Sequence, residues 1–141
     1  MKQAMTLEDV LAHENRIQVR VTYHDADIMG HAYYARYLVW FEMGRTEWIR
    51  DFGVSYKELE QRGILLPVRE CRVRYHAPAM YDDLITVVTR AKELTRTRLE
   101  FECRVEQADG ALVAEGSTLH PFVSPERRVL RAGYDVFGIN D

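Results

Sequence analysis

The segment from about residue 34 to residue 52 constrains the fold most, because its side chains are apolar around much of a helix. Its large apolar residues cover one helical face and the flanks of that face: Tyr37, Leu38, Val39, Trp40, Phe41, Met43, Trp48, Ile49 and Phe52. A helix of this kind is buried rather than lying on a surface. Gly44 in the middle would let another backbone come close, and Gly53 is placed to end the helix.

Strand patterns flank this helix on both sides. Before it, Ile17, Val19, Val21 and Tyr23 alternate with polar residues, which predicts a half-buried strand. After Gly63 the sequence predicts four more strands, at roughly 65–75, 84–94, 97–106 and 112–123, and Asp109-Gly110 is typical of a hairpin turn between the last two. The order of one strand, one long helix and a run of strands predicts an α+β fold with a sheet wrapped around a helix.

Short helices complete the pattern at two places. Thr6 followed by Asp9 is typical of a helix start, and Ser55 with Glu58 predicts a second start for a helix ending near Gln61.

Length and composition limit the class of protein. The chain has 141 residues, so we expect residues 1–141 to form a single domain. A net charge of −3 gives no reason to expect a nucleic-acid partner. We expect no membrane span, because no apolar run is long enough, and we expect no secretory signal. These two expectations together favour a location in the cytoplasm. Cys71 and Cys103 are too few for a zinc site or a disulfide framework, so we expect two buried, reduced thiols.

The chemistry concentrates where the first strand meets the long helix. Asp25 and Asp27 follow the strand, Gly30 makes a turn, and the helix begins soon after. A carboxylate can attack a carbonyl or activate water, and free N–H groups at a helix start can hold a developing oxyanion. The segment therefore indicates an acyl-transfer type of reaction. Asp27 alone could also be a turn or capping residue.

Asp25 has the same strand parity as Asp27, so both side chains could face one side. The Asp-x-Asp spacing could hold Mg²⁺, but two carboxylates are a weak metal signal, and we expect a hydrogen-bonding role for Asp25. We expect no metal site and no cofactor.

Residues 21–50 resemble the signature region of hot-dog-fold acyl-CoA thioesterases of the 4-hydroxybenzoyl-CoA thioesterase type. The shared features are a Tyr-x-Asp-x-Asp strand end, Met-Gly in the turn and an aromatic-rich helix containing Trp-Phe-Glu-x-x-Arg-Thr-Glu. The later Tyr-His-Ala-Pro-Ala segment at 75–79 also fits the layout of that family. The resemblance implies a five-stranded antiparallel sheet wrapped around one central helix. It also implies a homodimer or homotetramer with active sites at subunit interfaces.

The resemblance also assigns roles to residues. Asp27 takes the position of the catalytic aspartate, and Tyr34 takes the position whose backbone N–H polarises the thioester carbonyl. Many relatives have histidine where this chain has Tyr34 and asparagine where it has Arg36. Here the histidine is His31, which could act as a general base, orient Asp27 or stabilise the loop; the last two are favoured.

Further candidates lie along the helix and in basic segments. Glu42, two turns beyond Tyr34, could be a second carboxylate at the site or pair with Arg45 at i+3. Some of the aromatic side chains would line an acyl pocket. The candidate substrate contacts, including arginines suited to coenzyme A phosphates, are Gly30, Tyr33, Tyr37, Arg96, Arg98, Arg127 and Arg128.

The predicted function is hydrolysis of an acyl-CoA thioester, with Asp27 as nucleophile or general base. Two alternatives stay open. One is a hot-dog hydratase or dehydratase, which His31 keeps possible. The other is a non-catalytic acyl-CoA binding module, which the presence of Asp27 disfavours.

Overall fold

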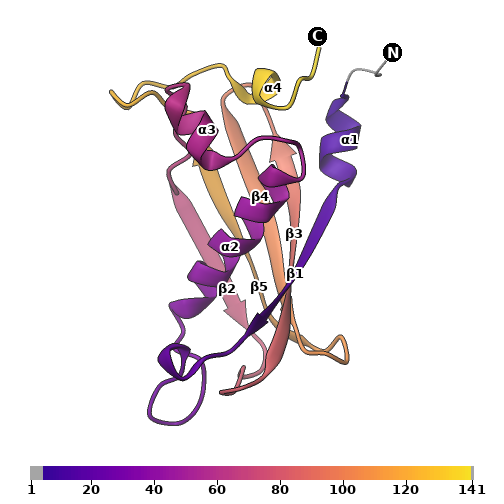
Figure 1. Cartoon of the computed structure of the whole chain (residues 1–141), viewed down its shortest axis with the longest axis vertical. Helices are drawn as coiled ribbons and strands as arrows, with labels where there is room; N and C mark the ends of the chain where they lie inside the picture. Colours follow the sequence, from indigo (N-terminus) through magenta and orange to yellow (C-terminus); the bar gives the residue numbers. More distant parts are fainter. Residues whose placement is uncertain (1–4, 141) are drawn as a thin grey trace.

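A computed structural model describes residues 5–140 and shows one antiparallel sheet curving around one long helix (Figure 1). The five strands are β1 (Glu14–Arg20), β2 (Glu70–Tyr75), β3 (Leu84–Leu94), β4 (Arg98–Glu106) and β5 (Leu112–Pro121), in the spatial order β1-β3-β4-β5-β2. Helix α2 (Arg36–Arg50) lies across one face of this sheet. The predicted α+β arrangement is confirmed.

Three short helices and one 3₁₀ turn complete the described chain: α1 (Leu7–Ala12), η1 (Tyr23–Asp25), α3 (Tyr56–Gln61) and α4 (Gly133–Val136). Thr6 and Asp9 form the predicted capping box at the start of α1, with both reciprocal bonds present. Ser55 caps α3 by accepting a hydrogen bond from the Glu58 N–H at 3.1 Å. Gly53, at φ +82°, follows α2 in the left-handed conformation that glycine adopts without strain.

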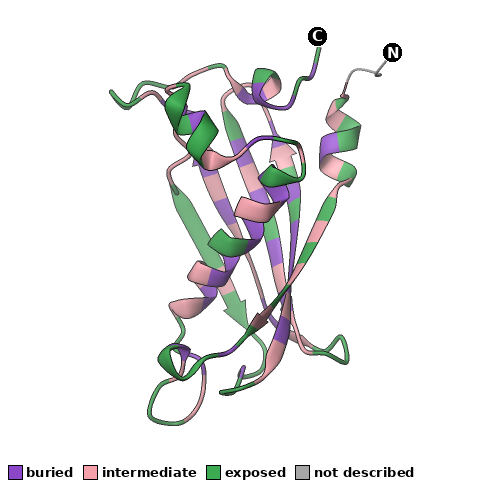
Figure 2. Ribbon diagram, in the orientation of Figure 1, coloured by how far each residue is buried: buried purple, intermediate pink, exposed green. Residues whose placement is uncertain are grey.

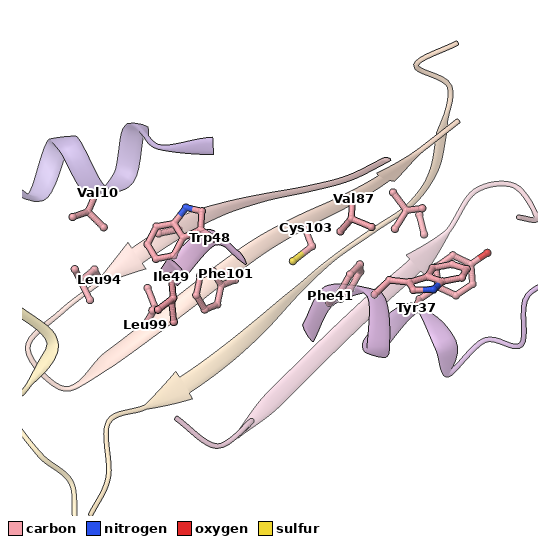
Figure 3. Packing of buried hydrophobic residues seen from close by; sticks show 14 of the residues in the cluster. Val10, Tyr37, Phe41, Trp48, Ile49, Val87, Leu94, Leu99, Phe101 and Cys103 are labelled. Atoms are coloured by element: carbon pink, nitrogen blue, oxygen red, sulfur yellow. The ribbon is translucent and has the colours of Figure 1, made fainter. Parts of the chain in front are cut away.

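The core lies between α2 and the sheet (Figure 3). Trp48 is fully buried and packs edge-on against Phe101, with ring centroids 5.1 Å apart. On β4 the residues of one parity, from Leu99 to Val105, are all buried, as their alternation predicted. The residues of the other parity are polar and partly or fully exposed (Figure 2). One face of the sheet therefore covers the helix and the other face is polar.

Element boundaries differ from the sequence prediction at three places. The first strand ends at Arg20 rather than near Tyr23, because the chain turns into η1. Helix α2 begins at Arg36, two residues after Tyr34. Strand β2 begins at Glu70 rather than near Leu65, which makes only an isolated bridge to Val123. Pro67 lies between them and lacks the N–H that a continuous ladder needs.

Two packing predictions were wrong. Cys71 is exposed, because β2 is an edge strand with exposed side chains along most of its length (Figure 2). Gly44 does allow a close approach, but side chains of β3 make it: a Cβ on Gly44 would overlap the Thr89 hydroxyl and touch Val87. The buried thiol prediction holds for Cys103, and burial raises the pKa of that thiol to about 12.

Candidate active site

Asp25 ties the loop after β1 to the start of α2. Its Oδ2 accepts hydrogen bonds from the Thr22 N–H at 2.8 Å and from the Thr22 hydroxyl at 3.0 Å. Its Oδ1 accepts a hydrogen bond from Arg36 Nε at 2.8 Å and lies 2.8 Å from Arg36 Nη2 in the ion pair. The Asp25 side chain is buried, with 3% of the residue exposed. The clamp thus fixes the chain that leaves the strand relative to the first residue of the helix.

The electrostatics of Asp25 follow from these contacts. Burial alone would raise the pKa of this carboxyl group, but the hydrogen bonds from Thr22 and Arg36 outweigh burial and lower the pKa below its ordinary value. All of its strong acceptor directions are used within the protein. The expected structural role therefore fits, and the alternative of an Asp-x-Asp magnesium site does not.

Asp27 lies in a tight exposed turn, so the two carboxylates do not face one side as strand parity suggested. Its N–H donates to the His31 carbonyl at 2.8 Å, and its carbonyl accepts from the Gly30 N–H at 3.0 Å. Its Oδ1 accepts from the Met29 N–H at 2.8 Å, while Oδ2 has no hydrogen bond within the described chain. Gly30 closes the turn at φ +79°, where a side chain would be strained. The turn therefore anchors one carboxylate oxygen and leaves the other free.

Space is available beside this turn. Asp27 borders an open hollow of about 390 Å³ whose other walls include Tyr23, Ile28 and Tyr81. Tyr23 and Tyr81 meet edge to face, with ring centroids 5.4 Å apart. Asp27 thus borders a space with aromatic walls.

The start of α2 leaves backbone donors available. Within residues 5–140, neither the Tyr34 N–H nor the Ala35 N–H donates a hydrogen bond. Ala35 is the N-cap and supplies no capping side chain. The Tyr34 carbonyl accepts a hydrogen bond from the Tyr75 hydroxyl at 2.7 Å, which holds this peptide in place from strand β2. Free N–H groups and the helix dipole together favour negative charge at this end of α2.

His31 and Tyr33 lie between the carboxylate and the helix. The His31 backbone bridges to Met80, and its carbonyl accepts the Asp27 N–H; its ring makes no hydrogen bond within the described residues. His31 is half-buried in this loop. Tyr33 is exposed, and its ring lies 4.5 Å from that of Tyr34 between centroids. The structure therefore brings Asp27, Gly30, His31, Tyr33 and Tyr34 into one loop.

Two other predicted residues lie apart from this loop. Tyr37 is buried in the core, where it packs on Trp40 and Tyr75 and accepts a hydrogen bond from the Ala79 N–H at 3.3 Å. Its ring has almost no surface left for a substrate. Glu42 is exposed and forms no ion pair with a described residue, so the predicted pair with Arg45 is not made.

The predicted arginines lie at the opposite end of the sheet. Arg96 and Arg98 follow the far end of β3, and the Arg96 guanidinium stacks over Tyr134 at 4.5 Å from the ring centroid. Arg98 pairs with Glu93 at 2.7 Å. Strand β3 has 11 residues, which places these groups about 35 Å from the Asp27 end. Arg127 and Arg128 follow β5, which also ends on the far side (Figure 1).

Sequence reasoning missed two residues that shape this site. Tyr75 holds the Tyr34 carbonyl across 41 positions of sequence, and Arg36 was noted only as a departure from asparagine. An Asp and an Arg that flank a turn could have suggested the Asp25–Arg36 pair. Nothing in the local pattern indicated the contact of Tyr75 with Tyr34.

In the described part of the chain no group of three or more His, Cys, Asp or Glu side chains is arranged to hold a metal ion. Over the same residues, no helix is both long and apolar enough to cross a membrane.

A sheet curved around one helix, with a carboxylate in the turn before the helix start, defines a hot-dog enzyme fold of the thioesterase class. The sequence matches the Thioesterase-like superfamily over residues 21–132, and the chain belongs to this family.

Known proteins are similar over most of the chain. The acyl-CoA thioester hydrolase YbgC of Escherichia coli O6:H1 is 34% identical over 83% of this chain and 87% of its own length. The putative acyl-CoA thioesterase YneP of Bacillus subtilis is 31% identical over 81% and 83%. The crystal structure of the DHNA-CoA thioesterase of Staphylococcus aureus superposes with a TM-score of 0.81 at 27% identity, covering 84% of this chain and 80% of that one. The predicted hot-dog fold and thioesterase family are confirmed.

Proposed function

We propose that this chain hydrolyses an acyl-CoA thioester to the free acid and coenzyme A. One observation carries the proposal: a carboxylate with a free oxygen, Asp27, lies in the same loop as the unused backbone N–H groups at the start of α2. The names of the curated relatives support the choice of an acyl-CoA as substrate. We treat residues 1–141 as one catalytic domain.

The start of α2 would polarise the thioester. The carbonyl oxygen accepts a hydrogen bond from the Tyr34 N–H, and negative charge that develops there is stabilised by this donor and by the helix dipole. The Asp25–Arg36 clamp and the Tyr75 hydroxyl hold the donor in position before substrate arrives. Removing one such donor typically costs about 10²–10³ in rate, so this interaction is a large part of the catalysis.

Asp27 would supply the second half of the chemistry by one of two routes. As a nucleophile it attacks the carbonyl carbon, expels the coenzyme A thiolate and forms an anhydride that water then hydrolyses. As a general base it removes a proton from water, which attacks while the carbon–sulfur bond breaks. In both routes the thiolate takes up a proton and the acid is released. The hydrogen bond from the Met29 N–H orients the carboxylate for either route.

His31 supports the turn in this proposal. Its carbonyl binds the Asp27 N–H, so the contact runs through the backbone and leaves the ring free. Glu42 has no catalytic role here, because it lies eight residues beyond Tyr34, about 12 Å along the helix axis.

A second copy of the chain would complete the site. Tyr34 is 63% exposed and Tyr75 is 46% exposed, next to the open edge of β2. An unpaired edge strand favours pairing with another strand. If two copies paired β2 to β2 in antiparallel fashion, the far end of one would lie beside the Asp27 end of the other. Arg96, Arg98, Arg127 and Arg128 of that copy would then be placed to meet coenzyme A phosphates, as a homodimer or as half of a homotetramer.

The test is a thiol-release assay with short, long and aromatic acyl-CoAs. The proposal expects stoichiometric release of coenzyme A and free acid from at least one of them. A hydratase would change an enoyl- or hydroxyacyl-CoA without releasing thiol, and a binding module would show affinity without turnover. Either result would contradict the proposal.

A further inference from the structure

A second cavity lies beside α2, beyond the proposed reaction centre. It has a volume of about 270 Å³, and its walls combine apolar side chains, Leu38, Val39 and Val68, with Arg45, Cys71 and Thr118. Leu38 and Arg45 follow Tyr34 at i+4 and i+11, which places all three on one face of the helix. The cavity therefore begins one helical turn past the Tyr34 N–H and extends along α2.

Arg45 is the unusual member of this cavity. Only 9% of the residue is exposed, yet its guanidinium forms no ion pair with a carboxylate of the described chain, and the neighbouring group that interacts with it is the uncharged Tyr56 hydroxyl. The other arginine near the active site, Arg36, has Asp25 as its partner. Buried charges are normally paired, because an unpaired charge loses its solvation without compensation. Arg45 therefore lacks the carboxylate partner that a buried arginine ordinarily has.

The nearest carboxylate does not fill this role. Glu42 lies at i−3 from Arg45 and borders the same cavity, but it is exposed and makes no ion pair with Arg45. Glu42 is exposed to solvent, whereas Arg45 is buried. The predicted Glu42–Arg45 pair is therefore absent from the described structure.

The groups behind Arg45 carry no negative charge. His120 is fully buried, and its Nδ1 contacts the Leu66 carbonyl at 3.0 Å, so that nitrogen carries the proton. Its Nε2 then accepts from the Thr118 hydroxyl at 2.8 Å. Burial, and next the positive charge of Arg45, lower the pKa of His120 to about 4, so the ring is neutral at physiological pH. The Tyr56 hydroxyl interacts with Arg45 and is also uncharged, because burial raises the pKa of Tyr56 to about 12. The floor of the cavity is thus positive overall.

We propose that this cavity receives the far end of the acyl group and that Arg45 binds a carboxylate there. The substrates would be CoA thioesters of dicarboxylic acids, with apolar methylenes against Leu38, Val39 and Val68. A guanidinium presents two parallel N–H groups that match the two oxygens of a carboxylate. The inference rests on the proposed thioesterase function and names its substrate class.

The geometry sets the length of the acyl group. Eleven residues separate Tyr34 from Arg45, about 16 Å along the helix axis. Side chains on a helix lean toward its N-terminus, so the guanidinium lies closer to the carbonyl site than this spacing implies. A medium-length dicarboxylic acyl group would span the gap, and a very short one would not.

The test compares matched substrates that differ only at the far end. Adipoyl-, suberoyl- and sebacoyl-CoA are measured against hexanoyl-, octanoyl- and decanoyl-CoA, with ω-hydroxyoctanoyl-CoA as a neutral polar probe. Enzymes are the wild type, Arg45→Met, Arg45→Lys and the control Arg50→Met, which removes an exposed arginine of the same helix. Thermal unfolding and the binding of both suberoyl-CoA and octanoyl-CoA by calorimetry are measured for each.

The wild type is expected to favour suberoyl- over octanoyl-CoA in kcat/KM. Arg45→Met should lower the suberoyl value about 10–100-fold, the range for a hydrogen bond to a charged group, with little change for octanoyl-CoA. Arg45→Lys should keep part of the preference, and Arg50→Met should keep all of it. A wild-type preference for the octanoyl or ω-hydroxy substrate, or an equal loss on all substrates in Arg45→Met, would overturn the proposal.

Failure of the thioesterase function itself would look different. In that case no substrate would release thiol, and the calorimetric comparison of suberoyl-CoA with octanoyl-CoA still decides the role of Arg45. If Arg45→Met does not fold, the preference for suberoyl- over octanoyl-CoA is compared between the wild type and Arg45→Lys, and this comparison tests the role of Arg45 in the same way.

Discussion

Replacing Asp25 by asparagine should destabilise the protein and loosen the active-site loop. The carboxylate accepts three hydrogen bonds, two from Thr22 and one from Arg36 Nε, and it also forms an ion pair with Arg36 Nη2. An asparagine side chain keeps the size but has only one oxygen. The NH₂ group of the asparagine must therefore point at the donors of either Thr22 or Arg36, where no hydrogen bond can form. Arg36 also loses the negative charge that balances its own.

The magnitude follows from these contacts. Breaking a buried ion pair costs about 3–5 kcal/mol. The Arg36 side chain is 30% exposed and can recover part of its solvation, so the lower end of that range applies. We therefore expect the free energy of unfolding to fall by about 3 kcal/mol, which corresponds to a drop in Tm of about 10 °C for a chain of this size. Because the clamp positions the start of α2, kcat should fall as well.

The assay is equilibrium unfolding in urea at neutral pH, with Asp109→Asn as a matched control. Asp109 is an exposed turn residue that accepts a hydrogen bond from the Ala111 N–H at 2.9 Å, a bond that asparagine can also make. The control should change stability by less than about 0.5 kcal/mol. A loss below about 1 kcal/mol in Asp25→Asn would refute the reasoning about the clamp.

The same variant predicts a change in pH dependence. The pKa of Asp25 is lowered in the folded state, so its contribution to stability is present above the ordinary carboxyl pKa and is lost as pH falls through the folded value. Asp25→Asn should therefore weaken the decline of stability in acid.

Three further outcomes are expected. The pKa of His120 is about 4 in the folded protein, so the neutral ring contributes stability above pH 6.5, and this contribution is lost as pH falls toward 4. Between pH 6.5 and pH 4, the free energy of unfolding measured in urea should therefore fall by about 3 kcal/mol more in the wild type than in His120→Gln. A thiol reagent should label Cys71 at once in the native protein and Cys103 only after unfolding, and two fast thiols would contradict the burial of Cys103. His31→Gln should reduce kcat only modestly and leave the pH profile unchanged, whereas a loss of about 10²–10⁴-fold would make its ring a general base and favour the hydratase alternative.

Periodicity predicted the elements that form the hydrophobic contacts. The apolar pattern located β3 at Leu84–Leu94, and alternation located β4 almost to the residue, because both strands contribute buried side chains to the core. The helical spacing of Tyr37, Phe41 and Trp48 identified the buried face of α2 for the same reason. The cap at Ser55 was predicted because its hydrogen bond is local.

The candidate site was harder to predict because its geometry depends on long-range contacts. Asp25 and Asp27 share strand parity in sequence, but the 3₁₀ turn buries the first and exposes the second. Cys71 lies on a strand whose neighbour is missing on one side, which local alternation does not reveal. The arginines look equivalent to other basic segments until the topology places them at the opposite end of the sheet. The lack of a carboxylate partner for Arg45 is visible only once its surroundings are assembled.

The central claim has two parts. Asp27 performs the chemistry, and the start of α2 binds the thioester carbonyl of the substrate whether or not the Asp27 carboxylate is present. The most direct measurement compares Asp27→Asn with the wild type for single-turnover hydrolysis and for acyl-CoA affinity by calorimetry. Asparagine keeps the size and the hydrogen bond to Met29 but is neither a nucleophile nor a base. We predict a loss of about 10²–10⁴ in the rate of thiol release with a Kd close to that of the wild type. Near-normal turnover in Asp27→Asn would contradict the account.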